Sequence, residues 1–217
     1  MLGLIEKDLR LTLTRTQTLL LFFIMTLVMG ITIGGSFLIS YPAIIAVITA
    51  VGTISYDEFD NGFAFLMTLP FDRKTYIREK YLFSFLMVSA GWGLGAALYC
   101  VGAVFRRNAV PLADTLPMLM IPIPVFYLFA AILIPLQLKY GSEKSRIVFS
   151  VLFGSIAILI FGVKSVFSGS NNPFVRIAKR LDGLSPIPAL FTLAAVSVLL
   201  TYAFYLWSIR IIEKKEY

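Results

Sequence analysis

The chain has 217 residues, of which 59% are hydrophobic and only 14% are charged, and its formal net charge is +7. A soluble domain typically has about 25% charged residues, so the composition excludes an ordinary soluble domain and indicates an all-α protein that crosses the membrane several times. It also argues against a membrane β-barrel, because barrel strands alternate apolar and polar residues. The positive charge flanks apolar runs, as is usual in membrane proteins, and no nucleic-acid partner is expected.

Residue types narrow the chemistry further. Histidine is absent, which removes the commonest general base and metal ligand. The single cysteine, Cys100, lies in an apolar run and cannot form an internal disulfide. We therefore expect no metal site and no catalytic site in this chain.

Residues 1–17 are predicted to form an interfacial helix on the membrane surface. Its two faces differ in character: one carries Leu2, Ile5, Leu9 and Leu13, and another carries Glu6, Lys7, Arg10 and Thr14. Apolar residues on one helical face and charges on another are typical of a helix that lies in the interface. Two acids precede the first apolar run, which argues against a removable signal peptide.

Six apolar stretches follow, and each is read as a transmembrane helix, which needs about 20 residues. They cover residues 18–33, 43–55, 81–105, 115–138, 147–167 and 187–209. The first two are short, since Gly34, Gly35 and Ser36 are expected to break the chain and the second stretch follows Pro42. The whole chain, residues 1–217, is predicted to be one transmembrane domain.

Two of these stretches have features of their own. The third contains Gly91 and Gly95, whose spacing permits close helix contact, either within one subunit or between two copies. The fourth is expected to be bent or broken, because it contains four prolines. These are Pro117, Pro122, Pro124 and Pro135.

The distribution of basic residues predicts the orientation. With both termini in the cytoplasm, the inner segments hold 13 Lys and Arg residues and the outer segments hold six. This excess favours cytoplasmic termini in a multi-pass protein of the cell membrane. Residues 168–186 then lie outside, where residues 172–184 have the pattern of a short amphipathic helix.

Residues 55–81 form a charged segment between the second and third stretches. Its pattern predicts a helix over residues 57–69, with Asp57, Glu58 and Asp60 near its start, where acids complement the helix dipole. Pro70 would end this helix, and Asp72 would cap a second helix from Arg73 into the third stretch. The segment is either a hairpin that connects two spans or a surface onto which a soluble partner docks.

Three runs in this segment carry a resemblance to a known family. They are Tyr56-Asp57-Glu58-Phe59, Phe65-Leu66-Met67-Thr68-Leu69-Pro70, and Arg73-Lys74 with Lys80-Tyr81. With the amphipathic N-terminus and six spans, the chain resembles an ABC-2 type permease, the membrane subunit of an ABC exporter. Among small bacterial forms it is similar to the permeases of phenol-soluble modulin exporters, which expel amphipathic peptides.

The resemblance implies a role for the cytoplasmic segment, residues 56–80. In such permeases this segment is a coupling helix that seats in a cleft of the ATPase subunit. The residues expected to dock are Asp57, Glu58, Phe59, Asn61, Gly62, Phe63, Leu66, Met67, Leu69, Pro70, Arg73 and Lys74. A second permease copy or a paralogue is the other expected partner, alongside membrane lipid.

The chain has no G-x-x-x-x-G-K-[ST] loop to bind nucleotide phosphates. ATP and Mg²⁺ are therefore expected in the partner ATPase, and this chain is expected to be a transport subunit without enzymatic activity. The proposed spans contain almost no ionisable residue apart from Lys164, whereas ion-driven transporters usually keep acids or histidine there. A passive channel or membrane scaffold, and less plausibly an intramembrane enzyme, are the alternatives.

Aromatic residues are concentrated in the fourth and fifth stretches. Those that could line an apolar path are Phe126, Tyr127, Phe149, Phe153 and Phe161. Such a path would suit a hydrophobic or amphipathic substrate such as a peptide. Lipid contact and ordinary helix packing explain the same residues equally well.

Overall fold

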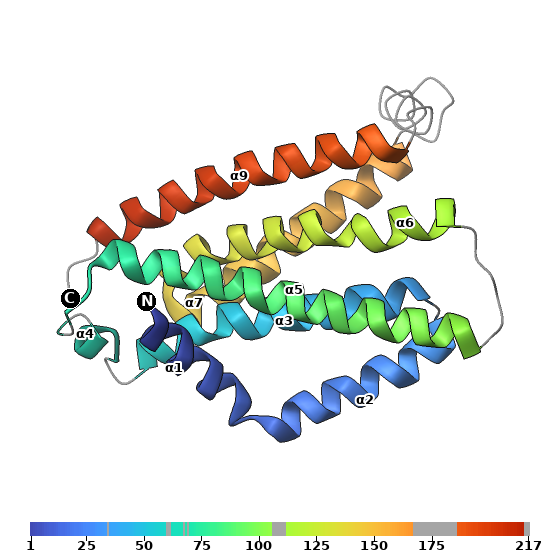
Figure 1. Ribbon diagram of the computed structural model, residues 1–217. Helices are drawn as coiled ribbons and strands as arrows, with labels where there is room; N and C mark the ends of the chain where they lie inside the picture. Colours follow the sequence, from blue (N-terminus) through green and yellow to red (C-terminus); the bar gives the residue numbers. More distant parts are fainter. Residues whose placement is uncertain are drawn as a thin grey trace.

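The computed structural model describes residues 1–33, 35–59, 62–66, 68, 70–105, 112–166 and 186–214, and all regular structure within them is helical. The helices are α1 Leu2–Leu13, α2 Thr16–Ile33, α3 Gly35–Glu58, α4 Gly62–Leu66, α5 Arg73–Phe105, α6 Leu112–Met120, α7 Pro122–Val166 and α9 Pro186–Lys214. Figure 1 shows the long helices running between two ends of the molecule. An all-α fold was expected from the composition.

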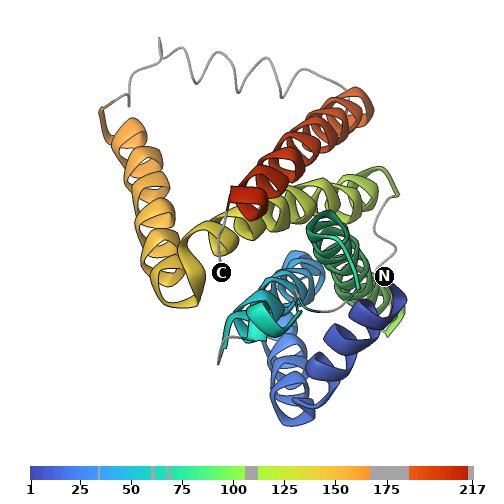
Figure 2. The ribbon, with the colours of Figure 1, turned by 90° about the vertical axis from the view of Figure 1, so that its left-hand side faces the viewer.

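The hydrophobic core lies between α3, α5 and the first half of α7. Its largest fully buried apolar side chains include Ile39 and Ile54 of α3, Tyr76 and Phe83 of α5, and Ile134 of α7. Helix α2 lies outside this core and exposes most of its apolar side chains, and α9 does the same. Figure 2 shows the second half of α7 diverging from the other helices. Apolar residues on these outer helices suit contact with lipid.

Helices α3 and α5 form the most extensive helix pair among the described elements. Two glycines of α5 bring the backbones together. A Cβ on Gly91 would lie 2.6 Å from the Pro42 carbonyl oxygen, and one on Gly95 would lie 2.5 Å from the Leu38 carbonyl oxygen. The small-residue motif of the third stretch therefore mediates packing within one subunit.

Four described helices are long and apolar enough to cross a membrane. They cover Gly35–Glu58, Arg73–Val104, Thr115–Gly141 and Leu190–Lys214. A fifth candidate is the pair α1 and α2, which are bent by 69° relative to each other. The chain is thus a multi-pass helical protein, and the count of six spans stays a prediction.

The second span was predicted wrongly at its start. Helix α2 ends at Ile33, as predicted, but Gly35 and Ser36 already belong to α3, and Pro42 is buried inside that helix. Pro42 is the eighth residue of α3, so it removes one helical hydrogen bond, and close packing of α5 against Pro42 and Leu38 holds the helix in place. The span is therefore 24 residues long, a comfortable length for crossing.

The proline-rich fourth stretch is broken as expected. Helix α6 ends at Met120, Ile121 forms a turn, and Pro122 begins α7. Helix α7 then bends at Gly141, whose φ of 74° and ψ of 175° fall in a region that essentially only glycine adopts. The predicted fourth stretch therefore covers α6 and the part of α7 before Gly141, and the predicted fifth stretch lies in the part of α7 after Gly141. The predicted outer segment, residues 168–186, lies outside the described residues except for Pro186.

Candidate functional site

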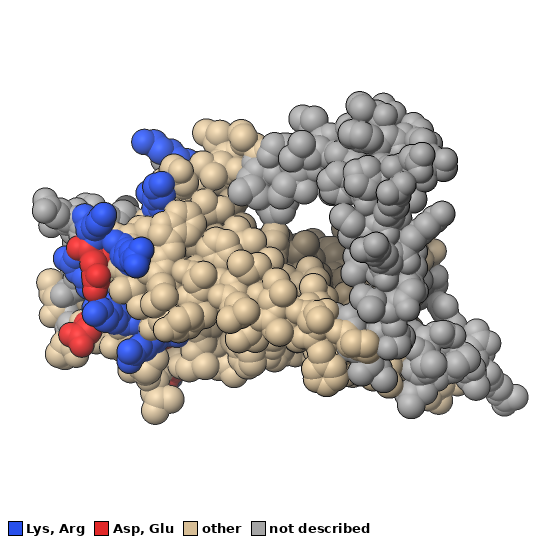
Figure 3. Space-filling model, turned by 90° about the horizontal axis from the view of Figure 1, so that it is seen from above, with Lys and Arg blue, Asp and Glu red and all other residues tan. Residues whose placement is uncertain are grey.

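Charged side chains gather at one end of the molecule. Figure 3 shows blue and red atoms concentrated at one end of the visible face, while the rest of the described surface is mostly tan. Helix α1, helix α4 and the start of α5 lie at this end (Figure 1). We call it the charged end, and we call residues 57–72, which join α3 to α5, the elbow.

Four charged side chains meet inside the charged end and form what we call the ion cluster. They are Lys7 and Asp8 of α1, Asp57 of α3 and Lys80 of α5. The Lys80 ammonium contacts the carboxylate of Asp8, lies 2.7 Å from Oδ2 of Asp57 and donates to Thr53 Oγ1 at 3.1 Å. Lys7 contacts Asp57 and lies 3.1 Å from Oδ1 of Asp8. Two cations and two anions balance, which limits the cost of burying them.

Three members of the ion cluster are shielded from solvent, and the fourth, Lys7, is 33% exposed. Asp8 and Lys80 are 0% and 1% exposed, and Asp57 is 6% exposed. The hydroxyl of Tyr76, itself fully buried, donates to Oδ2 of Asp57 at 3.0 Å. The cluster thus ties α1, α3 and α5 together at one buried point.

These contacts shift the pKa values of the two α1 members of the cluster, Asp8 and Lys7. Burial by itself would raise the pKa of the Asp8 carboxyl, but the charges and hydrogen bonds of Lys80 and Lys7 outweigh burial and lower its pKa. Burial likewise opposes the charge of Lys7, and its contacts with Asp57 and Asp8 outweigh that effect and raise its pKa. Both groups are held in their charged forms.

Glu79 is a fifth buried charge beside the cluster. It is 0% exposed, and neither of its carboxylate oxygens has a hydrogen-bond partner among the described residues. Its Oε2 lies 3.9 Å from the Lys80 ammonium. An acid buried without hydrogen bonds is costly. The negative charge of Glu79 is therefore not fully compensated within the site.

The single helix predicted over residues 57–69 is wrong. Helix α3 continues through Glu58, and only Gly62–Leu66 form a separate short helix, α4. Asp57 and Glu58 therefore lie at the carboxyl end of a helix, not at an amino end where the dipole would favour them. Lys7 and Lys80 supply the compensating charge for Asp57 instead.

The second helix of the segment was predicted correctly. Helix α5 begins at Arg73 and runs without interruption to Phe105. The carbonyl of Asp72 accepts hydrogen bonds from the amides of Thr75 and Tyr76 at 2.8 and 3.2 Å, as expected at an N-cap position. The elbow is therefore continuous with a membrane span, and a force applied to the elbow would act on that span.

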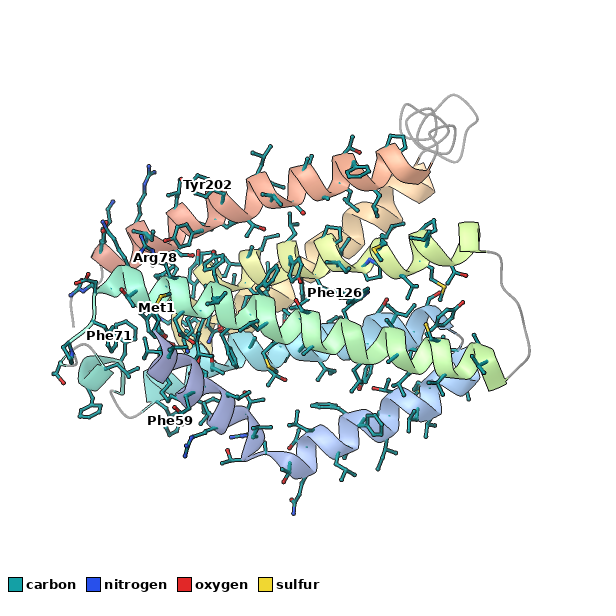
Figure 4. The ribbon with its side chains drawn as sticks, in the orientation of Figure 1. Met1, Phe59, Phe71, Arg78, Phe126 and Tyr202 are labelled. Atoms are coloured by element: carbon teal, nitrogen blue, oxygen red, sulfur yellow. The ribbon has the colours of Figure 1, made fainter. Side chains whose placement is uncertain are left out.

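The expected docking residues divide into buried and exposed groups. Phe63 and Leu66 of α4 are 3% and 8% exposed, and the Phe63 ring contacts the Tyr76 ring edge-on at 5.2 Å. Phe59 and Phe65 are 70% and 68% exposed, and Figure 4 shows Phe59 at the charged end. Buried residues fix the elbow to the bundle, and exposed ones are available to a partner.

The remaining docking residues are placed as follows. Gly62 begins α4, Pro70 is exposed, and the side chain of Glu58 lies close to Gly141, where an added Cβ would be 3.5 Å from Glu58 Oε2. Arg73 donates to the Ile212 carbonyl at 3.1 Å, and Lys74 lies 3.3 Å from Glu213, so both bind the end of α9. Asn61, Met67 and Leu69 lie outside the described residues.

The predicted path-lining aromatics lie away from this site. Phe126, Tyr127 and Phe149 are partly buried and pack against the core, and Figure 4 shows Phe126 within the bundle. Tyr127 also borders an apolar groove. The side chains of Phe153 and Phe161 lie outside what the structure describes.

Sequence reasoning did not predict that Asp8, Thr53, Tyr76 and Lys80 meet in a buried cluster, although Lys80 was among the residues that carry the family resemblance. Asp8 was read as an acid of the N-terminus and Lys80 as a basic flank of a span. A signal existed in α1, because Asp8 lies four residues from Leu4 and from Thr12, which also face inward. The partner of Asp8 is 72 residues away, and no local pattern identifies such a contact.

The site and the fold define a multi-pass helical membrane protein with an elbow clamped by buried charges at one end. The family model described as ABC-2 family transporter protein matches residues 3–213. The chain therefore belongs to the ABC-2 transporter family, which confirms the resemblance to ABC-2 type permeases. This membership places it in the context of an ABC transporter with an ATPase partner. No curated protein and no solved structure matches the chain.

Proposed function

We propose that this chain is the permease subunit of an ATP-driven exporter and that the elbow receives mechanical work from the ATPase. ATP and Mg²⁺ bind to the separate ATPase subunit, and this chain provides the membrane path. Two permease chains, identical or paralogous, assemble with two ATPase subunits in the cell membrane. The charged end faces the cytoplasm, in keeping with the excess of basic residues there.

One observation carries the proposal: the elbow exposes aromatic side chains and begins at Asp57, a member of the ion cluster that joins three helices. Phe59 and Phe65 offer large apolar side chains to a groove on a partner. Phe63 and Leu66 anchor the same short helix in the core. Force on the exposed side of the elbow is therefore delivered to α1, α3 and α5 together.

The substrate follows from the character of the bundle. The described spans offer aromatic and aliphatic side chains, and Phe126, Tyr127 and Phe149 lie among them. We propose a hydrophobic or amphipathic substrate, such as an amphipathic peptide of the phenol-soluble modulin type. Purified complex in vesicles should accumulate such a peptide only when ATP and the ATPase subunit are present.

The docking test uses an exposed elbow residue. Asp57 and Phe63 are unsuitable for it, because both are buried and their substitution would disturb the fold. Phe65→Asp should abolish co-purification with the partner ATPase subunit and reduce permease-dependent ATP hydrolysis at least about tenfold, as loss of an aromatic anchor does. Phe65→Leu is the matched control and should retain most of both.

Thermal unfolding of the permease without the ATPase distinguishes a docking defect from a folding defect. Because Phe65 is 68% exposed, the Phe65→Asp protein should unfold at the same temperature as wild type. Unchanged binding and hydrolysis in Phe65→Asp and in Phe59→Asp would contradict the docking role. Uphill transport by the permease without any ATPase would contradict the proposed function as a whole.

A further inference from the structure

A groove between α5, α7 and α9 lies outside the site described above. It has a volume of about 320 Å³. The rings of Phe85 and Tyr127 stack at 4.5 Å on one side, and Tyr81 and Tyr205 meet edge-on at 5.4 Å on another. Val198 and Tyr202, which are 67% and 61% exposed, also line it and open it to the surface of the bundle.

Three of the four phenol hydroxyls that line this groove already have hydrogen-bond partners. Tyr127 shares a hydrogen bond with Ser89 at 2.6 Å, and Tyr81 shares one with Ser208 at 3.0 Å. The Tyr205 hydroxyl accepts one from Arg78. The part of a ligand that enters the groove therefore needs no polar atoms, and an apolar chain fits it best.

Arg78 lies at the charged end of the groove. It is exposed, and its Nε donates to the Tyr205 hydroxyl at 3.1 Å. Figure 4 shows Arg78 near the start of α5 and Tyr202 on the facing helix α9. Among the described residues no ion pair includes Arg78, whereas Lys74 of the same helix is paired with Glu213. The guanidinium is thus fixed by a phenol and keeps donors for an anion.

We propose that this groove binds a membrane phospholipid with an anionic headgroup. One acyl chain lies along Phe85, Tyr127 and Val198, parallel to the helices, and the phosphate meets Arg78. Seven residues separate Arg78 from Phe85, about 10 Å along a helix, which is a suitable offset between a headgroup and the upper part of a chain. An anionic lipid is favoured over a zwitterionic one because no carboxylate of the described residues neutralises Arg78.

The position of the groove in the membrane agrees with this ligand. Tyrosines are enriched where the bilayer meets water, and basic residues at that depth attract anionic lipids. Four tyrosines line the groove and Arg78 contacts one of them, next to an outer helix that exposes Val198 and Leu199. The site does not depend on the proposed export function, since any membrane protein can retain such a lipid.

Native mass spectrometry of the purified full-length chain tests the proposal with two lipids of identical acyl chains, phosphatidylglycerol and phosphatidylcholine. Wild type should retain one phosphatidylglycerol with about a tenfold preference, as one charge-assisted contact provides. Arg78→Gln should lose the preference, and Arg210→Gln, an exposed basic residue on α9, should keep it.

Filling the groove with a larger side chain is the second part of the test. Val198→Trp should abolish retention of both lipids, whereas Leu199→Trp should not, because Leu199 is equally exposed but lies outside the lining. Equal retention by the Val198→Trp and Leu199→Trp proteins would overturn the proposal, as would a wild-type chain without headgroup preference. A change of oligomeric state in Val198→Trp alone, with no lipid retained by wild type, would also overturn it and assign the groove to a second copy.

Discussion

Removing the ammonium of Lys80 tests the ion cluster most directly. The three donors of this group contact Asp8, Asp57 and Thr53, and the side chain is 1% exposed. In Lys80→Met, the two buried carboxylates would share only Lys7. Breaking a buried pair in this way costs about 3–5 kcal/mol, which corresponds to a fall in unfolding temperature of about 6–20 °C for a chain of this size.

A matched control exists on the same helix. Lys74 is also ion-paired, with Glu213, but the two side chains are 57% and 47% exposed. An exposed pair contributes at most about 1 kcal/mol, so Lys74→Met should lower the unfolding temperature by no more than about 4 °C. The assay is thermal unfolding of purified protein in detergent, followed by intrinsic fluorescence of its two tryptophans.

The double variant Asp8→Asn with Lys80→Met gives a sharper result. It leaves Lys7 and Asp57, which balance each other, whereas each single variant leaves one unpaired charge. The loss of stability in the double variant should therefore be smaller than the sum of the losses in the two single variants, by about 2 kcal/mol. Additive losses, or a Lys80→Met protein as stable as Lys74→Met, would refute the reasoning.

Three further substitutions test the packing and the electrostatics, all by the same unfolding measurement. Gly95→Ala should destabilise the protein by about 1–3 kcal/mol, because the new Cβ would lie 2.5 Å from a backbone oxygen of α3. Gly93→Ala, which has open space around it, should be neutral or slightly stabilising. Equal effects of the two substitutions would contradict the close contact. Gly141→Ala should cost about 1–3 kcal/mol through its backbone angles, and an unchanged unfolding temperature would contradict the kink. Glu79→Gln should stabilise, because the amide is neutral where the carboxylate lacks hydrogen bonds. A fall in stability would show that the attraction between Glu79 and the Lys80 ammonium outweighs the cost of burying the charge.

Local sequence patterns predicted the elements that depend on local rules. Apolar length indicated the four spans that the described helices support, Asp72 and Pro70 marked the start of α5, and the prolines of the fourth stretch marked the break at Ile121. The same rules failed at Gly35 and Pro42, where packing against α5 holds a helix that propensity alone disfavours. The family followed from loose motifs around the elbow, and the family model confirmed it.

The interior of the site could not be predicted from sequence in this way. Asp57 was assigned to an exposed docking surface, although its carboxylate is buried by groups that are 50 and 23 residues away in the chain, Lys7 and Lys80. Which charges meet depends on how α1 folds back over α3 and α5. That fold-back is a property of the tertiary structure, and periodicity within one helix contains no information about it.

The composition of the ion cluster determines which parts of the permease can move separately in a transport cycle. Helix α1 supplies half of its charges, so withdrawing α1 would leave Asp57 and Lys80 to balance alone and expose a buried face to water. Under the proposed function, α1, the end of α3 and the start of α5 therefore move as one body. Bending must occur elsewhere, and the structure offers two places: the 69° bend between α1 and α2, and Gly141 of α7, where the backbone already departs from helical geometry. Gly141 also lies beside Glu58, the last residue of α3 and part of the elbow. A displacement of the elbow would therefore act on the kink of α7 directly, without moving the rest of the bundle.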